Sequence, residues 1–207
     1  MVIYVHADQT VEVRAPLKLA QSTINAFVAN RSDWIEKQRR LLAERPVLPS
    51  DQLKHQGRLL YLGRWLDIEH HMTRTRKVLI HDNELAVYGG DRECIESRLL
   101  SWQSEQALKV FSERCAHWHA RFEPELPPYH LKVRRMRRQW GNCRTNGRIT
   151  LSLQLIRYPV ELIDYVVVHE LCHMRHMNHG EEFHALMTEM MPDWRERKIR
   201  LNSFSIE

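Results

Sequence analysis

Apolar and polar residues alternate at the very start of the chain. Residues 2–6 and 10–14 show this period of two on either side of Ala7–Gln9, a pattern that predicts a β-hairpin. After Pro16 the apolar residues instead recur every three or four positions, at Ile24, Phe27, Val28, Trp34, Ile35, Leu41 and Leu42. We expect one helix there that ends before Pro46, because the residue preceding a proline is driven out of the helical region.

The middle of the chain switches to short strand-like pieces and then to one long helix. The segment from Pro46 to Gln56 is predicted to be a loop. Pieces with strand character follow it at Arg58–Leu62, Trp65–His70, Lys77–His81 and Glu84–Tyr88. We expect these pieces to form a small antiparallel sheet. From Asp91, a residue type that caps helices, to Phe122 the apolar residues have helical spacing, which predicts a long helix.

The last third of the chain combines two strands with several helices. Tyr129–Arg135 and Arg148–Leu153 are expected to be strands on either side of the turn-rich segment Trp140–Gly147. Helices are expected to begin near Pro159, Gly180 and Pro192. The pattern therefore predicts an α+β fold, in which an N-terminal β-hairpin, a helix and a small antiparallel sheet precede a short sheet packed on the helix that carries His169.

Length and composition fit an ordinary globular protein. The chain has 207 residues, of which 43% are hydrophobic and 28% are charged. We expect a single domain over residues 1–207, with strands and long helices in 1–125 and the chemistry in 126–207. No apolar run approaches the ~18 residues that span a membrane, and no secretory signal is visible. The four cysteines form no CxxC pair, which favours reduced thiols and a cytoplasmic protein.

The pentapeptide His169-Glu-Leu-Cys-His173 carries a recognisable chemistry. Two histidines four residues apart on a helix differ by only about 40° in direction and about 6 Å in height. Both imidazoles can therefore reach one zinc ion at the ~2.0–2.1 Å that zinc requires. Glu170 lies beside them and can take a proton from a metal-activated water without being a ligand. We therefore expect a hydrolytic zinc centre on this helix.

A third zinc ligand must come from outside the pentapeptide, because catalytic zinc normally has three protein ligands. The downstream candidates are His176, His179, Glu181, Glu182 and His184. His176 faces the same side as His169 but lies about 10 Å along the helix axis, too far to converge on one ion. His179 is favoured, since its neighbours Asn178 and Gly180 permit a helix to end near Asn178 and fold His179 back. His184 or a glutamate of the next helix stays an alternative.

Positive charge is concentrated in one segment, residues 132–157. Its cations are Lys132, Arg134, Arg135, Arg137, Arg138, Arg144, Arg148 and Arg157, with no acidic residue among them. The segment carries +8 in a chain whose net charge is +5. Such a cluster is either a solvated basic face or a surface that attracts phosphates, nucleic acid or an acidic substrate. Trp140 and Tyr158 could stack on bases or belong to the core.

Further short motifs surround the pentapeptide. They are Arg138–Cys143, Ile149–Leu155, Pro159, Asp164-Tyr165 and Asn178–Gly180 with Phe183. Together with the HExxH sequence they resemble the YgjP-like family of predicted zinc metallopeptidases, which is related to the SprT-like and minigluzincin group. The resemblance implies a zincin-like core with one zinc ion on His169, His173 and His179, and Glu170 as the catalytic base. Where this family commonly has Arg, Ser and Trp, the chain has Gln139, Asn142 and His184.

We therefore expect a zinc-dependent hydrolase, most simply a metallopeptidase that acts on a peptide or protein substrate. Substrate contacts are predicted at Trp140, Gly141, Asn142 and Cys143, and an exposed strand edge before the ligand helix could pair with an extended peptide. One alternative is a metal-dependent nucleotide phosphohydrolase whose basic segment attracts phosphates. Another is a nucleic-acid-associated protein with a structural zinc ion. The oligomeric state is not predicted by the sequence.

Overall fold

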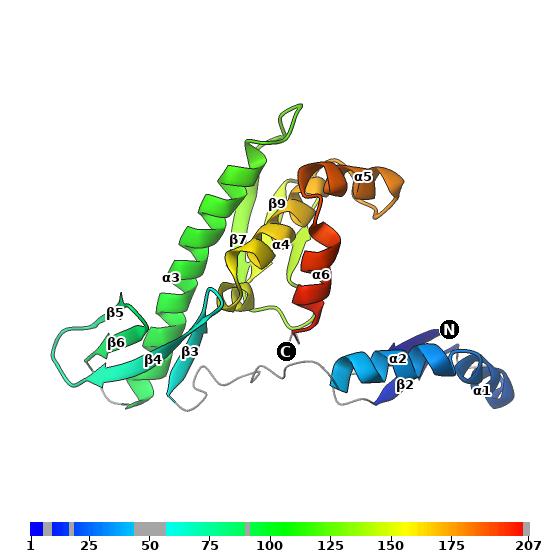
Figure 1. Cartoon of the computed structure of the whole chain (residues 1–207), viewed down its shortest axis with the longest axis horizontal. Coiled ribbons are helices and arrows are strands. Elements are labelled where there is room, and N and C mark those ends of the chain that lie inside the picture. Colours follow the sequence, from blue (N-terminus) through cyan, green and yellow to red (C-terminus); the bar gives the residue numbers. More distant parts are fainter. Residues whose placement is uncertain (6–9, 17–18, 44–56, 90–91, 205–207) are drawn as a thin grey trace. The chain divides into compact units, whose positions relative to one another are not determined.

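The computed structural model describes residues 1–5, 10–16, 19–43, 57–89 and 92–204 (Figure 1). The chain divides into two compact units, Met1–Leu48 with Asn202–Ser205, and Pro49–Leu201 with Ile206–Glu207. Among the described residues, no helix is both long enough and apolar enough to cross a membrane.

The first unit contains the predicted hairpin and two helices. Strands β1 (Val2–Val5) and β2 (Val11–Arg14) pair antiparallel, with Val2 opposite Arg14, which confirms the hairpin. The prediction of a single helix after Pro16 is wrong, because the structure has two helices there, α1 (Gln21–Ala29) and α2 (Ser32–Ala43).

The break between α1 and α2 follows from polar residues between the two apolar stretches. The N–H of Arg31 donates to the carbonyl of Val28 at 3.0 Å, a tight bond that ends the first helix. Ser32 and Asp33 follow, and both residue types favour a helix start over a helix interior. The loop expected over residues 46–56 lies outside the described residues, as does the capping residue Asp91.

The second unit begins with a four-stranded sheet. Its strands are β3 (Arg58–Tyr61), β4 (Arg64–His71), β5 (Lys77–His81) and β6 (Glu84–Tyr88). The spatial order is β3-β4-β6-β5, and β4 pairs with β6 in parallel. The expected antiparallel sheet is therefore a mixed one. Burial explains the order, because Leu85 and Val87 of β6 are fully buried whereas Leu79 of β5 is 45% exposed, so the more apolar strand takes the interior position.

A three-stranded sheet and a long helix complete the core of this unit. The long helix α3 (Arg92–His119) packs against both this sheet and helix α4 (Val160–Cys172) (Figure 1). Strands β7 (His130–Arg134) and β9 (Arg148–Ser152) were expected, whereas β8 (Gly141–Cys143) lies in the segment predicted to be turns. The order is β7-β9-β8, in which β7 is parallel and β8 antiparallel to β9.

Short helices follow this sheet. They are η1 (Leu153–Arg157), which precedes α4, and α5 (Glu181–Met190) and α6 (Trp194–Asn202), which follow it. The turn between β3 and β4 packs against the start of α4, since the N–H groups of Leu62 and Gly63 donate to the carbonyls of η1 at 2.8 and 2.9 Å. Gly63 has φ +82°, and a side chain there would lie 2.7 Å from Pro159, so only glycine fits this contact.

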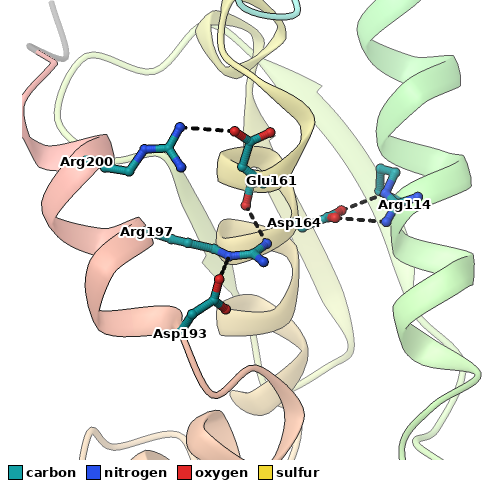
Figure 2. Close-up of polar contacts among 6 residues, drawn as sticks. All are labelled: Arg114, Glu161, Asp164, Asp193, Arg197 and Arg200. Atoms are coloured by element: carbon teal, nitrogen blue, oxygen red, sulfur yellow. Dashed lines mark hydrogen bonds and ion pairs between the residues drawn. The ribbon is translucent and has the colours of Figure 1, made fainter.

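Helix α4 is the centre of the unit, because ten of its thirteen residues are buried. Asp164 interrupts its apolar sequence and is buried too, and Figure 2 shows it facing Arg114 of α3. The guanidinium makes two hydrogen bonds to this carboxylate, at 2.6 and 2.8 Å. On the other side, Arg197 of α6 donates to the backbone carbonyl of Glu161 at 3.0 Å, and Arg200 binds the carboxylate of Glu161 (Figure 2). Polar contacts from two helices thus hold α4 in place.

Candidate metal centre

Three histidines meet where α4 ends. His169 lies in the last turn of α4 and His173 at its C-cap. The Nε2 atom of His179 lies 3.1 Å from Nε2 of His169, and the possible ligand atoms of His169, His173 and His179 are all within 4.8 Å of one another. Two nitrogens bound to one tetrahedral zinc ion would lie about 3.3 Å apart. The three imidazoles therefore form a cluster that could hold one metal ion.

The chain turns back toward the helix earlier than expected. The helix was predicted to stop near Asn178, but α4 ends at Cys172. The N–H groups of Met174 and Arg175 donate to the carbonyls of Leu171 and Cys172, three residues back, and these tighter bonds close the helix. The six residues from Met174 to His179 are then enough to bring His179 opposite His169.

A hydrogen bond orients His173. Its Nδ1 lies 3.0 Å from the backbone carbonyl of His176, which can only accept. Nδ1 therefore carries the proton, and the Nε2 lone pair of His173 is left for a metal. The side chain of His176 is outside the cluster and pairs with Glu182 at 3.2 Å. The structure thus gives His176 a supporting backbone contact and no place among the converging imidazoles.

The ring of Phe183 packs against all three histidines of the cluster. Phe183 on α5 is 1% exposed, and its centroid lies 5.0, 4.7 and 4.7 Å from those of His169, His173 and His179. His184, the next residue, instead stacks on Trp194 at 5.4 Å. Among the described residues, His184, Glu181 and Glu182 do not join the three-histidine group.

Burial favours the neutral form of two of the imidazoles, His169 and His179. Burial, followed by the neighbouring His173 and His179, lowers the pKa of His169 to about 3. Burial and His173 also lower the pKa of His179. Neutral imidazole is the form that binds metal, because protonation removes the lone pair. His169 and His179 therefore offer nitrogen donors near neutral pH without first having to lose a proton.

Glu170 is a buried carboxyl group beside this cluster. It is 4% exposed, and its Oε2 has no hydrogen-bond partner among the described residues. Burial raises its pKa to about 8. An uncompensated buried carboxylate is costly, and a divalent cation nearby would offset that cost. Three converging imidazole nitrogens next to a buried carboxyl group without a partner thus fit a site for a metal ion such as zinc.

The four residues predicted to contact substrate have different surroundings. Trp140 is 9% exposed and packs edge-on against Tyr158 at 5.2 Å, so both aromatic rings belong to the core and not to a stacking surface. Gly141 lies against Glu170, since a Cβ atom there would be 2.6 Å from Oε1. Burial and, to a lesser extent, the nearby Glu170 raise the pKa of Cys143 to about 11.

Asn142 lies on the opposite face of β8 and lines a hollow whose other lining residues are mostly lysine and arginine. Strand β8 is at the edge of its sheet, where among the described residues it pairs only with β9. A second cavity, of about 140 Å³, opens beside His173 and is lined also by Met174, Met177 and Pro127. The sequence did not reveal the contact of Gly141 with Glu170, because it joins residues 29 positions apart in the chain.

Comparison with known proteins gives one match over almost the whole chain. The family model for the YgjP-like metallopeptidase domain matches residues 1–204. No curated protein sequence matches. Among solved structures, the chain is similar to the metallopeptidase zymogen jannalysin of Methanocaldococcus jannaschii, at 15% identity, TM-score 0.37 and coverage of 45% of this chain and 91% of that one. The chain is also similar to the metallopeptidase zymogen abylysin of Pyrococcus abyssi, at 18% identity and a TM-score of 0.35. That match covers 47% of this chain and 90% of abylysin.

Proposed function

Because the chain belongs to the YgjP-like metallopeptidase family, we propose that it is a zinc-dependent peptidase in which His169, His173 and His179 hold one zinc ion. Glu170 is its general base. The observation that carries this proposal is the convergence of three imidazoles, whose possible ligand atoms lie within 4.8 Å of one another, beside the buried, unpartnered carboxyl of Glu170. The HExxH motif contains two of the histidines and the carboxyl group, and the chain after α4 turns back so that His179 lies close to the two histidines.

The donor set favours zinc over other metals. Three imidazole nitrogens with an open fourth position are typical of catalytic zinc, whereas magnesium and calcium prefer oxygen ligands. When bound, zinc would act as a Lewis acid that polarises a carbonyl group and lowers the pKa of water. The hydrogen bond from His173 to the carbonyl of His176 and the packing of Phe183 would keep the ligand rings oriented.

Glu170 moves the proton in this proposal. Its carboxylate takes a proton from the attacking water and returns it to the nitrogen of the leaving amine. A base that must also act as an acid works best with a pKa near the working pH. In the metal-free chain burial raises the pKa of Glu170 to about 8, and the positive charge of a bound zinc ion would lower it from there. The contact with the Gly141 backbone limits where this carboxyl can lie.

Strand β8 supplies the surface that would hold the substrate. It is an edge strand, and its first residue, Gly141, contacts Glu170. An extended peptide that pairs with this edge would bring its backbone past the catalytic carboxyl. The cavity beside His173 is lined by Met174 and Met177, so it could receive an apolar side chain next to the cleaved bond.

The test combines metal analysis with an activity comparison. Purified protein should contain one zinc ion per chain, and it should release peptides from an unfolded protein substrate. Glu170→Gln should retain the zinc ion and lose peptide release, because glutamine cannot accept the proton. Zinc-free protein that still cleaves peptides, or hydrolysis of nucleoside triphosphates without any peptide cleavage, would overturn the proposal.

A further inference from the structure

We infer that the outer face of the three-stranded sheet selects acidic side chains on the peptide bound along β8. This inference rests on the proposed peptidase function and adds a substrate class to it. The relevant feature is a hollow of about 180 Å³ on the sheet face that points away from α4, which we call the basic hollow. Its lining residues are Lys132, Arg134, Arg135, Met136, Asn142, Arg144, Arg148 and Thr150.

The strand register creates the basic hollow. Lys132 of β7 lies opposite Thr150 of β9, and Thr150 lies opposite Asn142 of β8, so these side chains form one row on one face. Arg134 lies two residues from Lys132 and therefore points the same way. Gly141 and Cys143, which alternate with Asn142, lie toward Glu170 of α4 instead. The sheet thus has a catalytic face and a cationic face that share the edge strand β8.

Most of the positive charge of the hollow has no carboxylate partner in the part of the chain that the structure describes. None of its lining residues is acidic. Of its five cations, Lys132, Arg134, Arg144 and Arg148 have no carboxylate partner among the described residues. Lys132 and Arg148 are diagonal neighbours on adjacent strands, an arrangement in which like charges repel. A concave surface with this charge concentrates anions and attracts acidic partners.

An extended peptide has the geometry to use both faces. Side chains of a strand alternate, so a peptide paired with β8 would direct every second side chain to the face of Asn142. Aspartate or glutamate at those alternate positions would lie at the mouth of the basic hollow. A nucleic acid is less well matched, because Trp140 and Tyr158, the aromatic residues of this region, pack against each other within the core.

Binding to an inactive variant tests this inference apart from catalysis. Zinc-loaded Glu170→Gln protein is titrated with two fluorescent decapeptides that differ only in having aspartate or asparagine at alternate positions. The aspartate peptide should bind about ten-fold more tightly at low salt, a difference that rising ionic strength should remove. Adding Lys132→Glu and Arg148→Glu should abolish the difference. These changes relieve repulsion in the hollow, so the variant is expected to stay folded.

Lys109→Glu combined with Arg74→Glu is the matched control, because this pair makes the same charge change at exposed positions outside the hollow. This control should keep the preference for the aspartate peptide. Equal binding of the two peptides, or equal loss of the preference in the control, would overturn the inference. So would a single-stranded oligonucleotide that displaces the aspartate peptide and loses binding in the double variant, which would assign the hollow to nucleic acid.

Cleavage assays separate this inference from the proposed function. Wild-type enzyme that cleaves both decapeptides with the same kcat/KM overturns only the acidic preference. Failure of the wild type to cleave any peptide would overturn the peptidase proposal, whatever the binding data show. Faster cleavage of the aspartate peptide that is reversed by Lys132→Glu with Arg148→Glu supports both.

Discussion

The α-carbon of Gly141 lies so close to Glu170 that a methyl group on it would be 2.6 Å from the carboxyl oxygen Oε1 and 2.9 Å from Cγ. The contact joins the edge strand β8 to the ligand helix α4. Glu170 is buried, so its side chain has little room to move aside. The absence of a side chain at residue 141 therefore sets the position of the carboxyl group that we propose as the base.

Gly141→Ala should displace Glu170 without disturbing the histidines. We expect kcat to fall by about 10- to 100-fold, because small misplacements of a catalytic group have effects of this size. Zinc content should be unchanged, since the three atoms nearest to the added methyl group all belong to Glu170 and not to a histidine. Steady-state kinetics and metal analysis of the same preparation check this, and full activity in the variant would contradict the assigned role of the contact.

Single substitutions should identify the zinc ligands. Alanine at His169, His173 or His179 should remove most of the bound zinc, because each imidazole supplies one of the converging nitrogens. His176→Ala should retain zinc, since only the backbone carbonyl of His176 contacts His173.

His184→Ala should also retain zinc, because His184 stacks on Trp194 outside the cluster. Zinc stoichiometry after dialysis is the measurement for all five variants. If the His176 or His184 variant loses the metal while His179→Ala keeps it, that histidine and not His179 would be the third zinc ligand.

The metal-free protein should become less stable as the pH rises, because of Glu170. The pKa of this carboxyl is ordinarily 4.5, as in the unfolded chain, and burial raises it to about 8 in the folded chain. Between these values the folded state holds a proton that the unfolded state has released. The free energy of unfolding therefore falls with rising pH across this window, by up to about 1.4 kcal/mol per pH unit.

Glu170→Gln isolates this effect, because glutamine does not ionise. In a chelator, the wild type should lose more stability than Glu170→Gln between pH 6.5 and 8 when urea unfolding is compared. The lowered pKa of His169, about 3, has the opposite sign, since the unfolded state takes up the proton as the pH falls below 6.5. That contribution acts below this interval and is common to both proteins. A pH-independent difference between the two would show that Glu170 is not perturbed.

The ion pair between Arg114 and Asp164 should be costly to break from one side. Arg114→Met would leave the buried Asp164 carboxylate without its two hydrogen bonds, and we expect a loss of about 3–5 kcal/mol in unfolding free energy. Adding Asp164→Leu should recover most of that loss, because an apolar pair has no desolvation cost. Denaturant titrations of the two variants give the comparison, and a double variant no more stable than the single one would argue against this account.

Local pattern was enough to predict much of this protein. The period of two around Ala7–Gln9 and the helical spacing from Asp91 to Phe122 are properties of neighbouring residues, and the hairpin and the long helix α3 follow from them. The spacing of His169 and His173 is also a local property, and it predicted that both rings lie on one side of their helix. The family resemblance, confirmed over residues 1–204, also came from short motifs.

Relations between distant segments were decided only by tertiary structure. The strand β6 takes the place beside β4 because Leu85 and Val87 must be buried, and alternation within each strand carries no information about its partner. In the same way, strand β8 has the composition of a turn and becomes a strand by pairing with β9. The sequence by itself determined which residue types could bind a metal and move a proton. The folded chain decided that Gly141 faces Glu170 and that Lys132 and Asn142 share the opposite face, because these contacts depend on register and burial across the sheet.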